Sequence, residues 1–424
     1  MSDTKYLGIL VGGGPAPGIN GVISAATIES INHGWQVLGI MDGFKHLAQA
    51  DTSQVMSLTI DDVSRIHFNG GSILRTSREN PTKDKAKVKN VIDSLIKLGI
   101  DRLITIGGDD TAYTASVIAN ETQNKIRIVH VPKTIDNDLP LPDNKSTFGF
   151  HTARHFGVEI VRNIMEDSVT TNRWYFIITM GRKAGHLALG IGKASGATLT
   201  IIAEEFGRKS VKIAQIADVL EGAIIKRLAM GKEHGVAILA EGLAEKLSSD
   251  DSILFSVGRD EHDNLRLADV DLGKFLKNEV KKRLDARGIK ITIVDKDIGY
   301  ELRCAPPIPF DCEYTRDLGY GASKFLQTGG SPPERLSGRA GGAMISLQGG
   351  KITPIYFPDI MDPATGKTRV RYVDVATESY EVARSYMIRL EKGDFGDTAQ
   401  LDKLCQAGKL SKEEFIKKFG WLNK

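Results

Sequence analysis

The sequence has few cysteines, little net charge and no long apolar run. Its three cysteines, Cys304, Cys312 and Cys405, lack the spacing of a metal motif and cannot all pair, so we expect a reducing, cytoplasmic location. The net charge of +3 is too small to indicate a nucleic-acid partner. The sequence contains no run of about 18 or more apolar residues, so we expect no membrane span. The first residues lead directly into a predicted strand rather than a signal peptide.

Motifs of several common site classes are incomplete. The stretch Gly-Gly-Gly-Pro-Ala-Pro-Gly at residues 12–18 has neither the Lys-Ser/Thr of a P-loop nor a full Gly-x-Gly-x-x-Gly. His151 and His155 are four residues apart, but no further element of a zinc-binding helix follows, so we expect a packing or surface role. The composition, 41% hydrophobic and 26% charged, indicates a soluble globular protein of two domains or lobes.

The start of the chain alternates strand and helix. Residues 6–11 predict a strand, residues 19–33 a helix closed by Gly34, and residues 35–40 a second strand. This order predicts a parallel sheet with phosphate chemistry at the carboxyl ends of its strands. Further elements are expected as strands at 174–179, 197–203, 235–240 and 289–294, helices at 84–98, 146–167, 211–230, 274–286 and 378–390, and a hairpin at 343–355.

Two stretches carry the candidate chemistry, and the first covers residues 102–111. A β-branched strand ends there in Gly-Gly-Asp-Asp-Thr, and Thr111 is predicted to cap a helix starting at Ala112. The two glycines let a phosphate approach the helix N-terminus, where Asp109 can hold the Mg²⁺ that accompanies it. The alternative is a tight strand-to-helix turn without chemistry.

The second stretch, residues 129–138, ends in Lys-Thr-Ile-Asp-Asn-Asp. Asp136 and Asp138 are two residues apart, so in an extended loop they point to the same side. One can act as general base while the other orients the group or holds a metal. Both could instead be turn formers. Taken with the glycine stretch, the two loops predict phosphoryl transfer.

These stretches resemble the phosphofructokinase family, whose donor loop is Gly-Gly-Asp-Gly-Ser/Thr and whose catalytic loop is Pro-Gly/Lys-Thr-Ile-Asp-Asn-Asp. The resemblance spans roughly residues 6–347 and implies an α/β fold of two Rossmann-like lobes with mostly parallel sheets. It implies a donor lobe at 1–145, a sugar-phosphate lobe at 146–312 and a C-terminal segment, 313–424, that returns to pack on the lobes. At the two variable positions of these loops, the residue types Asp110 and Lys133 resemble those of the family's pyrophosphate-using branch.

The resemblance also implies roles for the donor and catalytic residues. In the family, the donor phosphates lie against the first glycine loop and an arginine of a Gly- and hydroxyl-rich loop, which is residues 68–81 here; the alternative for this loop is a solvated surface. The matching positions are Gly13, Arg78 and Asp110 for the donor, Asp109 for Mg²⁺, and Lys133, Thr134, Asp136 and Asp138 in the catalytic loop, of which Thr134 and Asp136 also contact the sugar phosphate.

A further set of matches concerns the sugar phosphate. Residues 174–182 form another strand, glycine and helix start, with Arg182 placed to meet an anion. Family members bind the sugar phosphate with Met-Gly-Arg, Glu-Gly and Tyr-x-x-Arg steps, and an arginine seven positions before the Met reaches the neighbouring subunit's site. A glutamate at a strand end is otherwise simply solvated. The matching residues are Arg173, Met180, Gly181, Arg182, Glu241, Tyr300 and Arg303.

The implied activity is a reversible, Mg²⁺-dependent phosphoryl transfer from pyrophosphate to the 1-hydroxyl of fructose 6-phosphate, in a homodimer or homotetramer with shared sites. An ATP-dependent 6-phosphofructokinase is the alternative within the family. The alternatives outside this class are a non-catalytic regulatory subunit that keeps the fold and a sugar-phosphate sensor, and the intact carboxylates of Asp109, Asp136 and Asp138 argue against both. Ser24 and Ile28 occupy the positions of the nucleotide-effector arginines of bacterial ATP-using members, so we expect no such effector site. Residues 246–271 are expected to form a surface excursion, and the tail at 412–422 to pack on the body or a partner.

Overall fold

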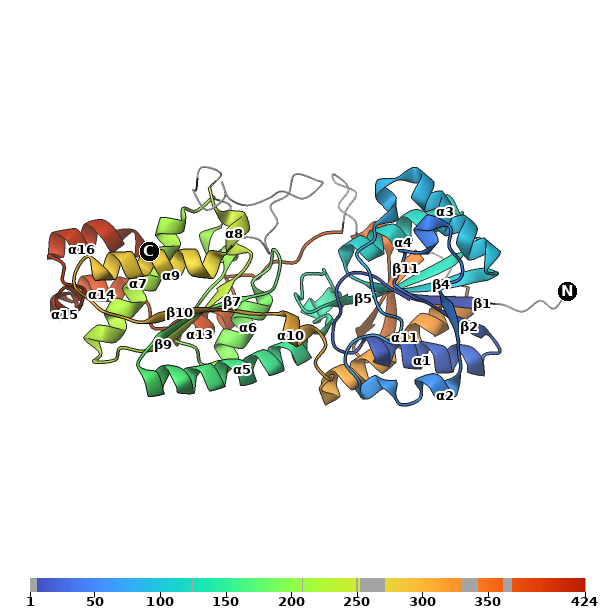
Figure 1. Cartoon of the computed structure of the whole chain (residues 1–424), viewed down its shortest axis with the longest axis horizontal. Helices are drawn as coiled ribbons and strands as arrows, with labels where there is room; N and C mark the ends of the chain where they lie inside the picture. The colour runs from blue at the N-terminus through green and yellow to red at the C-terminus, as the bar shows by residue number, and fades with distance from the viewer. Residues whose placement is uncertain are drawn as a thin grey trace. The chain divides into compact units, whose positions relative to one another are not determined.

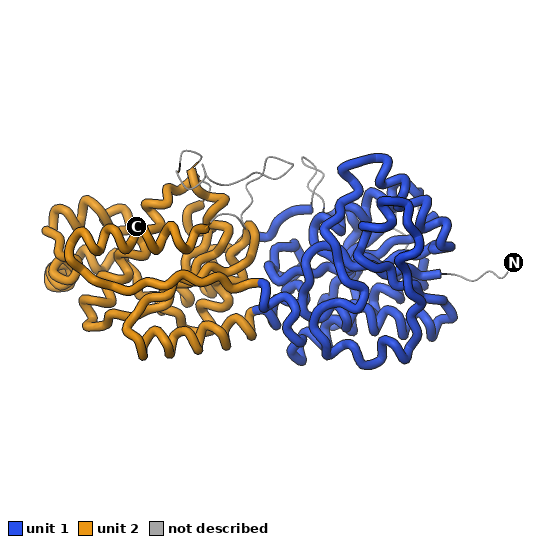
Figure 2. Tube along the Cα trace, in the orientation of Figure 1, with its two compact units in different colours: residues 1–153, 300–371 blue, residues 154–299, 372–424 orange. Residues whose placement is uncertain are grey.

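The computed structural model describes residues 6–123, 125–207, 209–248, 251, 271–329, 342–360 and 368–423. The chain forms two compact units, residues 1–153 with 300–371 (unit 1) and residues 154–299 with 372–424 (unit 2) (Figures 1 and 2). Most of the excursion expected at 246–271 lies outside the described residues.

The unit boundaries lie after residues 153 and 299, whereas the sequence placed lobe boundaries after 145 and 312. Residues 148–149 remain with unit 1 because they pair, as β6, with the end of β5. The chain re-enters unit 1 at Tyr300, and helix α11 (Pro309–Gln327) then packs against α1 (Ile19–Asn32). The C-terminal segment contributes to both units, since it is divided after residue 371.

Unit 1 is built on an eight-stranded sheet with the order β12-β11-β5-β4-β1-β2-β3 and with β6 beside β5. Its centre is parallel, and β3 and β12 run antiparallel to their neighbours at the edges. The strands are β1 (Tyr6–Val11), β2 (Gln36–Ile40), β3 (Val55–Leu58), β4 (Ile100–Gly107), β5 (Arg127–Thr134), β6 (Phe148–Gly149), β11 (Gly342–Gln348) and β12 (Lys351–Tyr356). Because β1 has β2 on one side and β4 on the other, the strand order reverses there, and α/β sheets bind ligands at such points.

Helices cover both faces of this sheet (Figure 1). Successive side chains of a strand point to opposite faces. Accordingly, Leu7 and Ile9 pack with α1 and α11, while Leu10 packs with α3 and α4. The remaining helices of unit 1 are α2 (Ile60–Val63), α3 (Lys85–Lys97), α4 (Asp109–Glu121), α10 (Tyr300–Arg303) and α12 (Phe357–Ile360). The predicted α/β fold with mostly parallel sheets is confirmed.

Unit 2 contains a four-stranded parallel sheet with the order β10-β7-β9-β8. Strands β7 (Trp174–Thr179) and β9 (Gly235–Ala240) have the predicted bounds, and β8 (Leu199–Ile201) is a shorter part of the predicted strand. The prediction at 289–294 is wrong, because β10 covers Ile293–Ile298. This edge strand includes Asp295, Lys296 and Asp297, so it does not have the apolar pattern of a buried strand.

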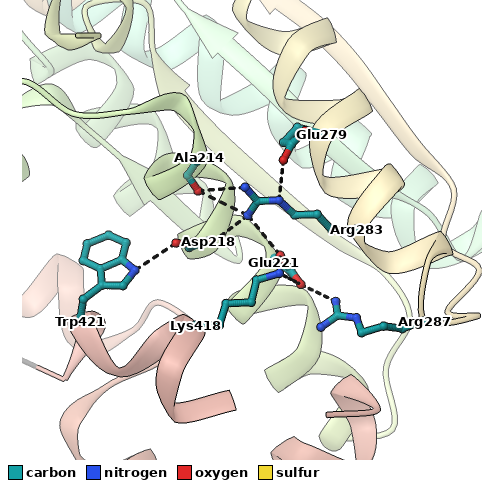
Figure 3. Close-up of polar contacts among 8 residues, drawn as sticks. All are labelled: Ala214, Asp218, Glu221, Glu279, Arg283, Arg287, Lys418 and Trp421. Atoms are coloured by element: carbon teal, nitrogen blue, oxygen red, sulfur yellow. Dashed lines mark hydrogen bonds and ion pairs between the residues drawn. The ribbon is translucent and has the colours of Figure 1, made fainter. Parts of the chain in front are cut away.

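The helices of unit 2 include a C-terminal cluster that packs on α7. Glu221 of α7 is fully buried and pairs with Arg283 at 3.4 Å, with Lys418 of the tail at 2.8 Å, and with Arg287 (Figure 3). The tail therefore packs on the protein body, one of the two expected positions. The helices are α5 (Phe150–Thr171), which begins in unit 1, α6 (His186–Ser195), α7 (Ile213–Ala229), α8 (Leu243–Lys246), α9 (Leu272–Asp285), α13 (Glu378–Ser385), α14 (Lys392–Gly396), α15 (Thr398–Gly408) and α16 (Lys412–Phe419). In the described parts of the chain, none of the helices has the length and apolar character needed to cross a bilayer.

Helix α5 begins at Phe150, four residues after the earliest start expected from the sequence. Its first turn is held by the fully buried Asp311, whose carboxylate accepts hydrogen bonds from the backbone N–H groups of Gly149 and Thr152, both at 2.9 Å. A carboxylate in this position satisfies amides that a helix leaves unpaired. Because the group comes from α11, the local sequence gives no indication of it.

Candidate active site

The carboxyl ends of β1, β4 and β5 lie side by side, because these strands are neighbours and parallel. β1 leads into the glycine stretch from Gly12, β4 into Gly108, and β5 into the loop from Ile135 to Asp138. The structure therefore brings the three predicted loops together at one edge of the unit 1 sheet. This edge carries the candidate donor and catalytic residues.

Lys133 links the first and third of these loops. It is the penultimate residue of β5 and is 5% exposed, and its ammonium group donates a hydrogen bond to the carbonyl oxygen of Gly14. Gly13 has a left-handed φ of 80°, and a Cβ atom there would lie 3.3 Å from the Lys133 Nζ atom. A side chain at Gly13 would thus be strained and would crowd the cation.

The segment that contains Arg78 is fastened to the same glycine loop. The Gly13 N–H donates to the Ser77 carbonyl oxygen at 2.8 Å, and the Thr76 hydroxyl donates to the Gly13 carbonyl oxygen at 2.6 Å. Arg78 follows directly and is exposed at this edge. The structure thus places Arg78 in the chain segment next to Gly13.

Arg303 lies against the glycine loop at Gly14. Its guanidinium carbon would be 3.4 Å from a Cβ atom on Gly14, and it stacks 4.9 Å from the ring centre of Tyr300. Tyr300 itself is 69% exposed. A guanidinium supported by an aromatic ring remains available to an anion.

The start of helix α4 differs from the prediction. The helix begins at Asp109, with Gly108 as its N-cap, so the prediction that Thr111 caps a helix starting at Ala112 is wrong. Thr111 is buried within the first turn, and its hydroxyl would be 2.4 Å from a Cβ atom on Gly12 or on Gly107. A glycine N-cap has no side chain to bond the first amides, which leaves them oriented toward an anion.

Both acidic residues of this loop therefore lie in the first helical turn. Asp109 is half-buried, whereas Asp110 is exposed. Among the described residues, no three His, Cys, Asp or Glu side chains gather into a metal site. Mg²⁺ in phosphoryl transfer is commonly held by one or two carboxylates, with water and substrate phosphates completing its shell. A single oxygen ligand from Asp109 beside the donor loop fits this coordination.

His130 is not among the residues predicted from the sequence, yet it supports the donor loop through Gly107. It lies in β5, fully buried, with Nδ1 2.9 Å from the Thr105 hydroxyl and Nε2 3.1 Å from the Gly107 carbonyl oxygen. A carbonyl only accepts, so Nε2 carries the proton and Nδ1 accepts from Thr105. Burial lowers the pKa of His130 to about 3, and the positive charge of Lys133 acts in the same direction, so the ring is neutral at pH 7. A lone histidine within an apolar strand was the signal available in the sequence.

This neutral histidine predicts a loss of stability in acid. The unfolded chain protonates His130 near its ordinary pKa of 6.5, whereas the folded chain does so only at about 3. The contribution of His130 to the free energy of unfolding is therefore fully present above pH 6.5 and is lost as the pH falls from 6.5 toward 3. Between about pH 7 and about pH 5 the loss from this group is about 2 kcal/mol. Urea unfolding of wild type and His130→Gln at both pH values measures it; an equal pH dependence in the two proteins would show that His130 does not contribute.

The predicted catalytic loop is turned rather than extended. Asn137, between Asp136 and Asp138, has a left-handed φ of 58°, so the expectation of an extended loop is wrong at this position. The Asp136 N–H donates to the Thr134 hydroxyl oxygen at 3.0 Å, and Asp138 is 9% exposed while Asp136 is half-buried. Asparagine adopts this conformation more easily than most residues, which explains its place between the two carboxylates.

Four of the residues predicted to bind the sugar phosphate form a cluster in unit 2, namely Met180, Gly181, Arg182 and Glu241, whereas Thr134, Asp136, Tyr300 and Arg303 belong to unit 1. β7 ends before Met180 and the neighbouring β9 ends before Glu241. One carboxylate oxygen of Glu241 accepts hydrogen bonds from the N–H groups of Gly181 at 3.0 Å and Arg182 at 2.6 Å. Arg182 is exposed and has a left-handed φ of 50°, an uncommon conformation for arginine. Glu241 thus holds the turn that presents Arg182.

Arg173 is the one predicted site residue of unit 2 that stands apart from this cluster. It precedes β7 and lies at the amino edge of the sheet, whereas Met180 follows β7 at the carboxyl edge. Seven residues of extended chain separate them by roughly 20 Å. Arg173 therefore does not join Arg182 within its own unit.

A comparison with models of known protein families identifies the family of this chain. A sequence model described as Phosphofructokinase matches residues 6–326. The chain belongs to the phosphofructokinase family. The matched region of this phosphofructokinase contains every predicted site residue, from Gly13 to Arg303.

Two relatives resemble this phosphofructokinase over nearly its whole length. It is 55% identical over 418 residues to the pyrophosphate–fructose 6-phosphate 1-phosphotransferase of Thermotoga maritima, covering 98% of each chain. It is 51% identical over 430 residues to the protein of the same name from Naegleria fowleri, covering 99% of this chain and 96% of that one. A solved pyrophosphate-dependent phosphofructokinase from Marinobacter aquaeolei aligns with a TM-score of 0.64 and 15% identity, covering 96% of this chain and 92% of that chain, which supports the fold.

Proposed function

We propose that this phosphofructokinase transfers a phosphoryl group from pyrophosphate to the 1-hydroxyl of fructose 6-phosphate, giving fructose 1,6-bisphosphate and phosphate in glycolysis. The observation that carries the proposal is the donor loop, where Gly108 caps α4 and Asp109 and Asp110 follow in its first turn. Two relatives at 55% and 51% identity carry the name of this activity. We place the protein in the cytoplasm, in line with its three unpaired cysteines.

The donor residues of unit 1 act by positioning and charge. Pyrophosphate would lie over the glycine loop at Gly13, with the N-terminal amides of α4, Arg78 and Lys133 neutralising its oxygens. Mg²⁺ held by Asp109 supplies further neutralisation of the donor's charge. Phosphoryl transfer involves little covalent chemistry by the protein, so these contacts account for most of the catalysis.

The acceptor is activated by the catalytic loop. Asp136 would take the proton of the 1-hydroxyl as the oxygen attacks in line, while Asp138 and Thr134 orient the group. In unit 2, the turn at 180–182 and Glu241 are the candidates for binding the sugar phosphate and its hydroxyls. In unit 1, Tyr300 and Arg303 are the candidates for the 6-phosphate. Since the phosphoanhydride of the donor and the ester product are similar in energy, the reaction is expected to run in both directions.

The direct test is conversion in both directions with purified protein. Fructose 1,6-bisphosphate should form from fructose 6-phosphate, pyrophosphate and Mg²⁺, and pyrophosphate should form from fructose 1,6-bisphosphate and phosphate. Omission of Mg²⁺ should abolish both reactions. A protein that binds fructose 6-phosphate but converts it with neither pyrophosphate nor ATP would instead be a sensor or regulatory subunit.

The position of Arg173 predicts active sites shared between subunits of a homodimer or homotetramer. Because Arg173 lies at the opposite sheet edge from Arg182, we expect it to serve the site of a neighbouring subunit. Asp136→Ala and Arg173→Ala proteins should each be inactive, and co-refolding them should regenerate some complete sites with activity. Mixed oligomers that form, as shown by differently tagged subunits, yet remain inactive would contradict shared sites.

A further inference from the structure

The catalytic loop is held by an arginine from the far end of the sequence. The Arg371 guanidinium donates to the Asn137 carbonyl oxygen from Nε at 3.1 Å and from Nη2 at 2.9 Å, and to the Lys145 carbonyl oxygen from Nη1 at 2.8 Å. Nη2 also donates to the Asn137 side-chain oxygen. The Arg371 backbone N–H donates to the Asp138 carbonyl oxygen at 2.7 Å. Arg371 therefore contacts both ends of the segment 137–145.

The contacts concentrate on the residue between the two candidate catalytic carboxylates. Asn137 is 7% exposed and left-handed, and its side-chain oxygen also accepts the Thr147 N–H at 3.0 Å. The Thr147 hydroxyl in turn donates to the Thr134 carbonyl oxygen at 2.8 Å. Arg371 and Thr147 thus hold the loop together through hydrogen bonds, and most of the accepting oxygens belong to the backbone.

The geometry suits arginine specifically. A planar guanidinium offers five donors in a fixed fork, and here three of its nitrogens reach oxygens of two residues. Burial lowers the pKa of Arg371, and the Asp138 carboxylate opposes this effect by favouring the charged form. An arginine remains protonated in such surroundings, so the clamp persists across the working pH range.

We propose that Arg371 is a positioning residue for phosphoryl transfer, which fixes the Asp136–Asp138 loop in its reactive conformation by clamping Asn137 and Lys145. The proposal rests on the function proposed above. Arg371 lies beyond the family match, which ends at residue 326, and none of the family motifs includes it. A displacement of about 1 Å at a reacting group costs about 10²-fold in rate, so the loss of the clamp should appear in kcat.

The test compares Arg371→Gln and Arg371→Lys with Arg369→Gln, an exposed arginine in the same segment that serves as a matched control. We expect Arg371→Gln to lower kcat by at least about tenfold, with KM for both substrates within about threefold of wild type. The kcat of Arg371→Lys should lie between those of Arg371→Gln and wild type, because lysine keeps the positive charge but lacks the planar fork of donors. Hydrogen exchange should accelerate in peptides covering 134–149, while β1 and β4 remain protected. Arg369→Gln should behave as wild type.

The outcomes separate this inference from the proposed function. A kcat within about twofold of wild type in Arg371→Gln, beside an inactive Asp136→Asn, would overturn the positioning role and leave the proposed function standing. If Arg371→Gln does not fold, Arg371→Lys decides: full activity would show that the fork is not needed. A uniform rise in exchange across unit 1 would show that Arg371 acts on stability alone and would also contradict the proposal.

Discussion

Replacing Asp136 with asparagine should lower kcat by about 10²–10⁴-fold, the usual contribution of a general base. Asparagine has nearly the same shape and keeps the loop's hydrogen-bonding capacity, but it cannot accept the proton of the 1-hydroxyl at neutral pH. KM for fructose 6-phosphate should change little, because the interaction that is lost belongs to the transition state. Steady-state assays at saturating pyrophosphate measure both quantities.

Asp143→Asn is the matched control for this substitution. Asp143 follows in the same segment, is exposed, and has a left-handed φ of 54° that asparagine tolerates. The control removes one negative charge near the site without touching the catalytic pair, so it should retain wild-type kcat. An Asp136→Asn protein with a kcat close to that of wild type would exclude Asp136 as the base.

The strands that deliver the site could be predicted from the sequence. β1, β7 and β9 have the bounds expected from their apolar runs and from the residues that end them. Buried parallel strands are continuous apolar stretches, so their limits are visible in sequence. The charged edge strand β10 lacks this pattern and was misplaced by four residues at its start.

What the sequence could not show are contacts between distant segments. The start of α5 depends on Asp311, and the conformation of Asn137 is fastened by Arg371, which is 234 residues away. The residue type of Thr111 suits a helix cap, yet its side chain fills the space left by two glycines, Gly12 and Gly107. Residue type indicates which groups are candidates for the site, whereas packing between elements determines how they are held.

The second large effect concerns the phosphoryl donor, which we expect Asp110 to select. Asp110 belongs to the donor loop and is exposed in the first turn of α4. A carboxylate there would oppose the α-phosphate of ATP by volume and by charge, whereas pyrophosphate has no third phosphate. Two like charges about 4 Å apart near a protein surface repel by about 4 kcal/mol, close to a thousandfold in affinity before counter-ions reduce it.

The alternative role for Asp110 is stabilisation of the helix terminus. A carboxylate in a first helical turn contributes only about 0.3–1 kcal/mol to stability and would leave donor choice unchanged. Asp110→Asn keeps the volume and removes the charge, while Asp110→Gly removes both. If Asp110 selects the donor, Asp110→Gly should lose activity with pyrophosphate and gain some with ATP, and Asp110→Asn should fall between it and wild type. A change in thermal stability alone, with an unchanged donor ratio, would favour the structural role.

The most direct measurement is the ratio of kcat/KM for pyrophosphate to kcat/KM for ATP, determined for the wild-type protein in one Mg²⁺ buffer at saturating fructose 6-phosphate. The donor loop and Asp110 predict a ratio well above one, up to about a thousand. Equal or better use of ATP by the unmodified protein would contradict the assignment of pyrophosphate as the donor.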